Sequence, residues 1–157
     1  MLGDSSGGLF AQQEAQNALA AGIVPIIPST AQGIVLKVSA TAPMSRNRYY
    51  VEDGGVSASM RPPRAAQFDT NLISDLRAAM YQEGLGTWFS AVIRVDREGS
   101  FDATFNYDDE PEWDAPVDPI VYLTDQETFP RDVENQPQWL QEKIAEGARR
   151  RHELGLG

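Results

Sequence analysis

Six carboxylates lie within one stretch of the chain, FNYDDEPEWDAPVDP, which runs from Phe105 to Pro119 and contains no Lys or Arg. Clustered carboxylates can bind calcium, share an acid–base reaction or present negative charge to a basic partner, and they can also simply keep a loop solvated. The candidate residues for such a role are Asp108, Asp109, Glu110, Glu112, Trp113 and Asp114.

Metal binding and catalysis are the less favoured uses of this stretch. The chain has no cysteine and one histidine, His152, which excludes thiolate chemistry and leaves a zinc site without its usual ligands. The spacing of the acids departs from the calcium loop D-x-[DN]-x-[DN]-G, and no glycine lies between Asp108 and Asp118. We therefore predict no enzyme activity, no catalytic residue, no metal and no cofactor. A calcium-binding module that uses the carboxylates of 108–118 and a carboxylate-dependent hydrolase remain alternatives.

The distribution of charge favours a protein partner. The formal net charge is −10, and residues 107–130 contain eight Asp or Glu and no Lys or Arg, whereas the rest of the chain is nearly balanced. Nucleic-acid binding needs a basic surface, so the sequence predicts no nucleic-acid partner. Trp113 lies among the charges, and a lone exposed tryptophan is unfavourable unless it packs on the core or contacts a partner. A basic protein surface is therefore the expected partner.

The positions that alternate between apolar and polar residues predict an antiparallel sheet. In 100–108, apolar Phe101, Ala103, Phe105 and Tyr107 alternate with polar residues, and 87–95 forms the preceding strand. Further strands are predicted over 33–41, 49–53 and 56–60, with a tight turn at Asp53-Gly54. The fold class is α+β: a single domain with an antiparallel sheet of about four to five strands and helices mainly on one face.

Three helices complete this prediction. One covers Leu9–Ala21 with Gly22 as its C-terminal cap, and the segment IVPIIP after it is expected to be an extended linker or edge strand. A second has Asp69 as its cap and an apolar face made by Leu72, Ile73, Leu76 and Met80. The third begins at about Pro137. The single domain over 1–157 then divides into a helix and linker (1–32), sheet and central helix (33–107), acidic loop region (108–134) and C-terminal helix (135–152).

Two features outside the acidic stretch have open interpretations. Trp88 lies on the opposite strand face from Phe89, so it is either covered by the chain termini or available to a partner. The loop RPPR, Arg61 to Arg64, is expected to be solvated, with docking on an acidic groove as the alternative.

The order of these elements resembles the YezG-like family of bacterial immunity proteins. The resemblance rests on the Tyr107-Asp108 pair after an aromatic strand, on FPRD at Phe129–Asp132 and on ENQPQWL at Glu134–Leu140. It implies a protein that binds a toxin of the same cell, an NAD-hydrolysing toxin in the first place and a nuclease toxin as the alternative. We expect a 1:1 complex in which the active site of the toxin is occluded. FPRD has a structural interpretation as well: a turn anchored by Phe129 in which Arg131 pairs with an acidic neighbour.

No stretch approaches the ~18 apolar residues of a membrane span, and the N-terminus lacks the pattern of a signal peptide. We therefore expect no membrane partner and a cytoplasmic location.

Overall fold

The computed structural model describes the backbone of residues 2–156 and the side chains of residues 8–156. The chain forms two compact units, each assembled from three segments. Unit 1 comprises Met1–Val38, Asn47–Met80 and Ala91–Thr104, and unit 2 comprises Ser39–Arg46, Tyr81–Ser90 and Phe105–Gly157. The predicted single domain stays a prediction, because interleaved compact units do not decide what folds independently.

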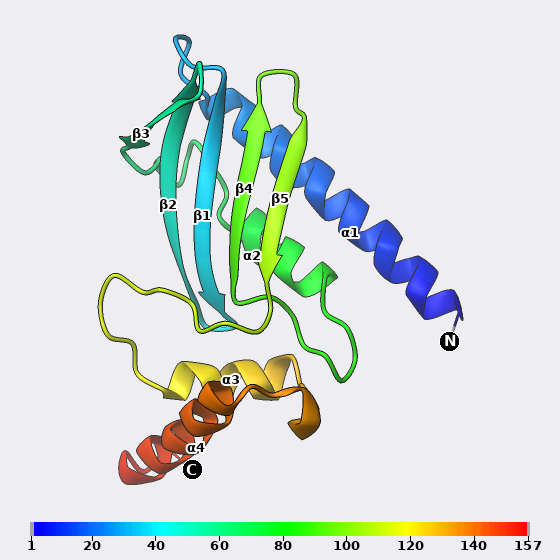
Figure 1. The fold of residues 1–157 in the computed structure, drawn as a ribbon, viewed down its shortest axis with the longest axis vertical. Coiled ribbons are helices and arrows are strands. Elements are labelled where there is room, and N and C mark those ends of the chain that lie inside the picture. The colour runs from blue at the N-terminus through cyan, green and yellow to red at the C-terminus, as the bar shows by residue number, and fades with distance from the viewer. Residues whose placement is uncertain (1, 157) are drawn as a thin grey trace. The chain divides into compact units, whose positions relative to one another are not determined.

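Five strands form one antiparallel sheet in the order β3-β2-β1-β4-β5 (Figure 1). The β2–β3 hairpin pairs Asp53 with Val56 across Gly54 and Gly55, whose φ angles are +58° and +82°. Two central residues with positive φ suit the twist of a two-residue hairpin, so the predicted turn is confirmed. The α+β fold class is confirmed as well. The strands are β1 (Gly33–Thr41), β2 (Met44–Asp53), β3 (Val56–Met60), β4 (Ser90–Asp96) and β5 (Phe101–Asn106).

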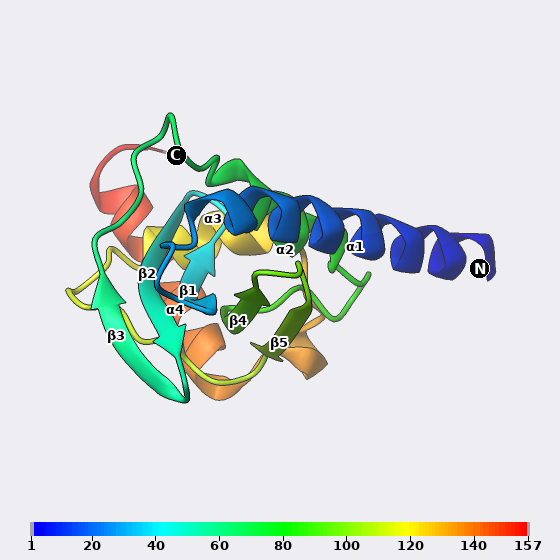
Figure 2. The ribbon, with the colours of Figure 1, turned by 90° about the horizontal axis from the view of Figure 1, so that it is seen from above.

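Helices α1 (Leu2–Ile23) and α2 (Asn71–Ala79) cover one face of the sheet in unit 1 (Figures 1 and 2). Every residue of β1 is buried except Lys37. Along β4, by contrast, Ala91, Ile93 and Val95 are buried, whereas Arg94 is exposed. This alternation is what a sheet covered on one face requires. For the two helices of unit 1, the prediction that helices cover one face is confirmed.

The end of α1 differs from the prediction. The helix continues through Gly22, which therefore is not its C-terminal cap. A Cβ atom at Gly22 would lie 2.6 Å from Cδ1 of Leu72, so this glycine allows α1 and α2 to approach closely. The prediction that the following segment, IVPIIP, is extended is wrong. The segment contains a short 3-10 helix, Val24–Ile26, because proline is well tolerated in a first helical turn.

The start of α2 follows its predicted cap. The backbone N–H of Asn71 donates to Oδ1 of Asp69 at 3.0 Å, which satisfies one of the amides that a helix start leaves unpaired. Ile73, Leu76 and Met80 are buried, as the apolar periodicity predicts.

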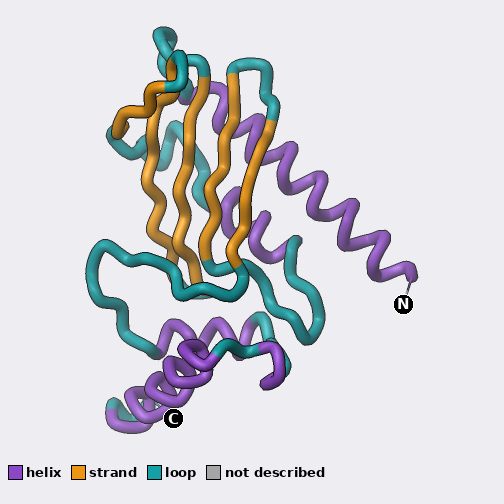
Figure 3. The backbone as a smooth tube through the Cα atoms, in the orientation of Figure 1, coloured by secondary structure: helices purple, strands orange, loops and turns teal. Residues whose placement is uncertain are grey.

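Unit 2 contains the helices α3 (Ile120–Thr128) and α4 (Gln138–Glu153), which pack against each other (Figure 1), and a 3-10 turn at Val133–Asn135. The sequence predicted an acidic loop region over 108–134, and α3 corrects its second half. The prolines keep the chain irregular as far as Pro119, and the helix begins directly after it (Figure 3). Asp118 assists this start, because its Oδ1 accepts the N–H of Ile120 at 3.0 Å.

Aromatic residues form the core of unit 2. The ring of Trp139 packs edge-on against the rings of Phe89 and Tyr122, with centroids 5.4 and 5.6 Å away. Such edge contacts stabilise aromatic clusters beyond their burial. The predicted helix near Pro137 is confirmed, and so is the core position of Leu140, whereas Trp139 is partly buried and packs against the core. The cluster comprises Phe89, Tyr122 and Leu140, surrounded by Val117, Val121, Trp139 and Ile144.

The contact between α3 and α4 gives a testable prediction at Gly147. A Cβ there would lie 2.5 Å from the backbone oxygen of Pro119, which cannot move without shifting the start of α3. Alanine normally favours a helix over glycine by ~1 kcal/mol, but here we expect Gly147→Ala to lower the free energy of unfolding by about 1–3 kcal/mol. Urea denaturation measures the change.

The matched control is Gly8→Ala in α1, where an added Cβ has nothing within 4 Å. We expect it to leave the stability unchanged or slightly raised. A stabilising Gly147→Ala would contradict the close approach of the two helices.

Candidate functional site

The acidity of the chain lies in unit 2. Unit 2 contains 14 Asp or Glu and 6 Lys or Arg, a formal net charge of −8. Unit 1 contains 9 Asp or Glu and 7 Lys or Arg, a formal net charge of −2. Residues 108–118, here called the acidic loop, supply six of these acids and all the candidate residues named from the sequence. The excess of negative charge therefore belongs to unit 2, and all contacts of the acidic loop described below lie within that unit.

Basic residues distant in sequence neutralise part of the acidic loop. Asp114 Oδ2 lies 2.7 Å from Nε of Arg46, and Asp118 Oδ2 lies 3.3 Å from Nε of Arg150. Both pairs are exposed, so each contributes little stability, about 0–1 kcal/mol. They nevertheless remove Asp114 and Asp118 from the set of uncompensated charges. Sequence alone could not reveal these partners, because they lie 68 and 32 residues away.

Asp109, Glu110 and Glu112 are the remaining acids of the loop. All three are exposed, and the described residues provide no ion pair for their carboxylates. Their backbone is held in place: the side-chain amide of Asn106 accepts the N–H of Asp109 at 3.0 Å and donates to the Asp109 carbonyl at 2.9 Å. The hydroxyl of Ser39 donates to the carbonyl of Glu112 at 2.7 Å. The loop therefore presents solvated charges from a fixed main chain.

Asp108 has a different role, because it contacts the buried Arg131. Nη1 of Arg131 lies 3.3 Å from Asp108 Oδ1, and the side chain of Arg131 is 3% exposed while that of Asp108 is 81% exposed. Arg131 also donates to the carbonyls of Tyr107 at 2.7 Å and of Asn135 at 3.1 Å. A buried guanidinium is tolerated when its donors are satisfied in this way. The predicted pairing of Arg131 with an acidic neighbour is confirmed.

The loop between α2 and β4 completes the surroundings of Arg131. The carbonyl of Thr87 accepts from Nη2 at 3.5 Å, and the guanidinium carbon lies 5.4 Å from the ring centroid of Phe89. At Gly86 the chain passes so close that a Cβ would lie 2.8 Å from Nε of Arg131. Phe129 anchors the turn as predicted, since its ring packs against that of Tyr81 with centroids 5.6 Å apart.

Trp113 is half-buried and anchored within unit 2. Its indole N–H donates to the hydroxyl of Tyr122 at 3.0 Å, and the two residues line a hollow of about 420 Å³. Burial raises the pKa of Tyr122 above its ordinary value, although the hydrogen bond from Trp113 acts in the opposite direction. The tryptophan can therefore offer part of its ring, but not its N–H group, to a partner. Its predicted partner contact stays a prediction.

Trp88 does not offer a partner surface, because it is fully buried at 0% exposure. Of the two interpretations from sequence, the one that made it available to a partner is wrong. Its ring packs against that of Phe105, with centroids 5.5 Å apart.

The acids do not assemble into a metal site within the described chain. No group of three or more His, Cys, Asp or Glu residues in that part of the molecule has the arrangement needed to hold a metal ion. The calcium alternative therefore has no ligand set there. His152 is exposed near the end of α4, a position that provides no buried pocket for proton transfer.

Unit 2 contains a second hollow, of about 590 Å³, that was not predicted from the sequence. The FPRD and ENQP segments supply much of the wall of this hollow and were the part of it that the sequence singled out. The rest of the wall comes from segments about 25 to 50 residues earlier in the chain, which the sequence did not connect with them. Its lining consists of Gln82, Leu85, Tyr107, Asp108, Arg131, Glu134, Asn135, Gln136 and Pro137.

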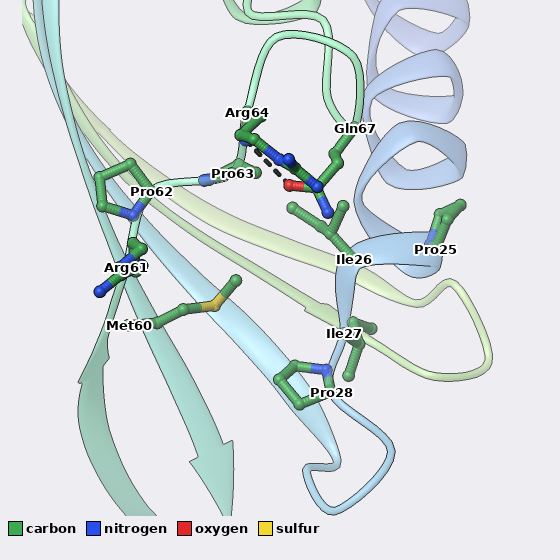
Figure 4. A pocket seen from close by; sticks show the side chains of 10 residues that line it. All are labelled: Pro25, Ile26, Ile27, Pro28, Met60, Arg61, Pro62, Pro63, Arg64 and Gln67. Carbon is green, nitrogen blue, oxygen red and sulfur yellow. Dashed lines mark hydrogen bonds between the residues drawn. The ribbon is translucent and has the colours of Figure 1, made fainter.

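Unit 1 contains a separate hollow of about 880 Å³ beside the RPPR loop (Figure 4). Met60 is directed toward Ile26 across it, and prolines form much of its wall. Arg61 and Arg64 are exposed, as predicted for a solvated loop. The N–H of Arg64 donates to the side chain of Gln67 at 3.0 Å, which closes the loop on itself.

Comparison of the chain with protein-family models and with curated protein sequences finds no match to either. In residues 2–156, none of the helices combines the length and the apolar character that crossing a bilayer requires.

The contacts of Arg131 predict a large effect of a conservative substitution. Lysine keeps the charge but cannot reach the carbonyls of Tyr107, Thr87 and Asn135 together, because it lacks the planar fork of donors. We expect Arg131→Lys to lower the free energy of unfolding by about 2–4 kcal/mol. Guanidinium denaturation followed by tryptophan fluorescence measures this loss.

Arg149→Lys is the matched control, since Arg149 is exposed on α4 and no described residue pairs with it. Its effect should stay within about 0.5 kcal/mol. Equal stabilities of the two variants would contradict the structural role of Arg131.

Proposed function

We propose that this protein is an immunity protein that binds and inhibits a cognate protein toxin in a 1:1 complex, using the acidic loop of unit 2. The observation that carries the proposal is the trio Asp109, Glu110 and Glu112, three exposed carboxylates without ion pairs on a hydrogen-bonded main chain. The resemblance to YezG-like immunity proteins, in the residues from Tyr107 to Leu140, supports the same conclusion.

Charge complementarity provides the physical mechanism. An NAD-hydrolysing toxin must hold the pyrophosphate of its substrate, and cationic side chains and helix N-termini are the usual means. An acidic loop placed over such a cleft competes with the substrate for those groups. Because its main chain is already fixed, the loop loses little conformational entropy when it binds.

A nuclease toxin would provide a similar target. Its cleft binds a phosphate backbone and is positively charged for the same reason. The acidic loop therefore fits both toxin classes, and we favour the NAD-hydrolysing toxin only on the resemblance. In either case the protein acts by binding, and we expect it in the cytoplasm, where a toxin made by the same cell must be blocked.

Tight inhibition needs more surface than the acidic loop alone. A stable interface buries about 800 Å² on each partner, with a few well-packed residues at its centre. The exposed part of Trp113 and the apolar residues around the loop are the available neighbours in unit 2. We therefore expect carboxylates to speed the encounter and apolar contacts to hold the complex.

Co-expression tests the function directly. The proposed function predicts that a gene beside this one encodes a toxin domain. That domain is produced with and without the protein, and growth, toxin activity and co-purification are measured. We expect growth to be restored and a 1:1 complex to be isolated. A toxin that remains active and unbound in the presence of folded protein would contradict the proposal.

The role of the loop is tested by charge reversal. The triple variant Asp109→Lys, Glu110→Lys and Glu112→Lys should bind the toxin at least ~10-fold more slowly, because electrostatic steering raises association rates by about 10–10³. Its association rate should also depend less on salt. Stopped-flow measurements at several ionic strengths give both quantities.

The matched control reverses three exposed acids of unit 1, Asp53, Asp75 and Asp102, which have no ion pair among the described residues. The change in net charge is the same in both triple variants. If both slow the association equally, only the total charge matters and the acidic loop has no specific role.

A further inference from the structure

We propose that the second hollow of unit 2 is an anchor pocket that receives a basic side chain, lysine or arginine, from the toxin. The inference rests on the proposed function and names the chemistry by which the complex is fixed. The pocket is distinct from the acidic trio, because none of Asp109, Glu110 and Glu112 lines it. Its function would be to bind one side chain tightly at the centre of the interface.

The size of the anchor pocket suits a side chain. Pockets for drug-sized ligands usually measure about 300–1,000 Å³, and this hollow, at about 590 Å³, therefore has ample room for one side chain. A long side chain can enter it with some ordered water. Leu85 and Pro137 provide apolar wall against which the methylene groups of lysine or arginine can pack.

The walls of the pocket are held in place by hydrogen bonds. The carbonyl of Gly84 accepts the N–H of Asp132 at 2.9 Å and the side-chain amide of Asn135 at 3.0 Å. Gly84 and Gly86 have φ angles of +81° and +77°, which other residues adopt with strain. Arg131 joins the remaining segments. A pocket preformed in this way binds without ordering its own loops first.

The charges at the pocket favour a cation. Asp108 and Glu134 are both exposed carboxylates in its lining. The single basic residue there, Arg131, is 3% exposed, and its guanidinium bonds to Asp108 and to backbone carbonyls. An incoming ammonium or guanidinium group therefore meets the carboxylate of Glu134, which has no ion pair among the described residues, the exposed carboxylate of Asp108 and a shielded cation.

One exposed apolar residue supports the same conclusion. Leu85 is 47% exposed, although it occupies a loop whose neighbours Gly86 and Thr87 are buried. A single exposed leucine is ordinary on a surface. Beside a preformed pocket with two carboxylates, however, it provides the apolar rim that excludes water around a central contact.

The first test uses small probes and does not need the toxin. N-acetyl-arginine amide and N-acetyl-lysine amide are titrated into the 15N-labelled protein at low salt, with N-acetyl-glutamine amide as the neutral control. We expect saturable shifts at the amides of 82–86, 107–108 and 134–136 with a Kd of order mM, the range open to a single side chain. Glu134→Lys should abolish them, while Glu14→Lys in α1 should not. Failure of both basic probes, or equal binding of the neutral probe, overturns the proposal.

The second test uses the toxin. Leu85→Lys and Glu134→Lys should each weaken toxin binding by about 30-fold or more, as truncation of a central contact does. The controls Val56→Lys and Glu14→Lys, at exposed positions of unit 1, should leave binding unchanged. Thermal melts confirm that all four variants fold.

The outcomes separate the two proposals. If the wild-type protein binds the toxin and both pocket variants bind it equally well, the anchor pocket is wrong and the immunity function stands. If the folded wild-type protein binds no toxin, the immunity function fails, and the anchor pocket fails with it.

Discussion

Unit 2 depends on one buried cation, the guanidinium of Arg131. Removing such a group from water is unfavourable unless its donors are satisfied, and here they are satisfied by carbonyls of three segments and by the carboxylate of Asp108. The arginine thereby joins the end of the sheet, the loop before β4 and the turn before α4. Because these segments are far apart in sequence, one side chain fixes much of the geometry of the unit.

The contacts of Arg131 also determine where the carboxylates of the acidic loop lie. The carboxylate of Asp108 forms an ion pair with Arg131, and the backbone carbonyl of Asp108 accepts a hydrogen bond from the indole N–H of Trp139 at 2.7 Å. Asn106 then fixes Asp109, so the loop leaves the core in a defined direction with its carboxylates in solvent. For the function proposed above this arrangement is favourable, because charges on a rigid main chain can attract a basic surface without the entropy loss of ordering a flexible loop. The same constraint shapes the proposed anchor pocket.

Local patterns predicted most of the sheet and the helix α2, since alternation and apolar periodicity are properties of neighbouring residues. They failed where a local signal pointed to the wrong structure and where the deciding contact is distant. Helix α3 was missed because three prolines precede it, although Pro119 ends the irregular segment and the helix follows. Gly22 was assigned as a cap because its contact with Leu72 on α2 is invisible in sequence. The six candidate residues lie within one short stretch of the chain, so composition alone identified them as candidates, and their role in binding stays a prediction. The ion pairs of Asp114 and Asp118, which reduce the number of loop carboxylates without a basic partner, could not be predicted from the sequence.

The central claim is that the toxin binds to unit 2 through the acidic loop. Hydrogen–deuterium exchange on the free protein and on its complex with the co-expressed toxin tests it most directly, because protected amides identify the contact surface. We predict that toxin binding slows exchange in 107–114, with further protection in 82–86 and 133–137. Protection confined to unit 1, with unchanged exchange throughout the acidic loop, would contradict it.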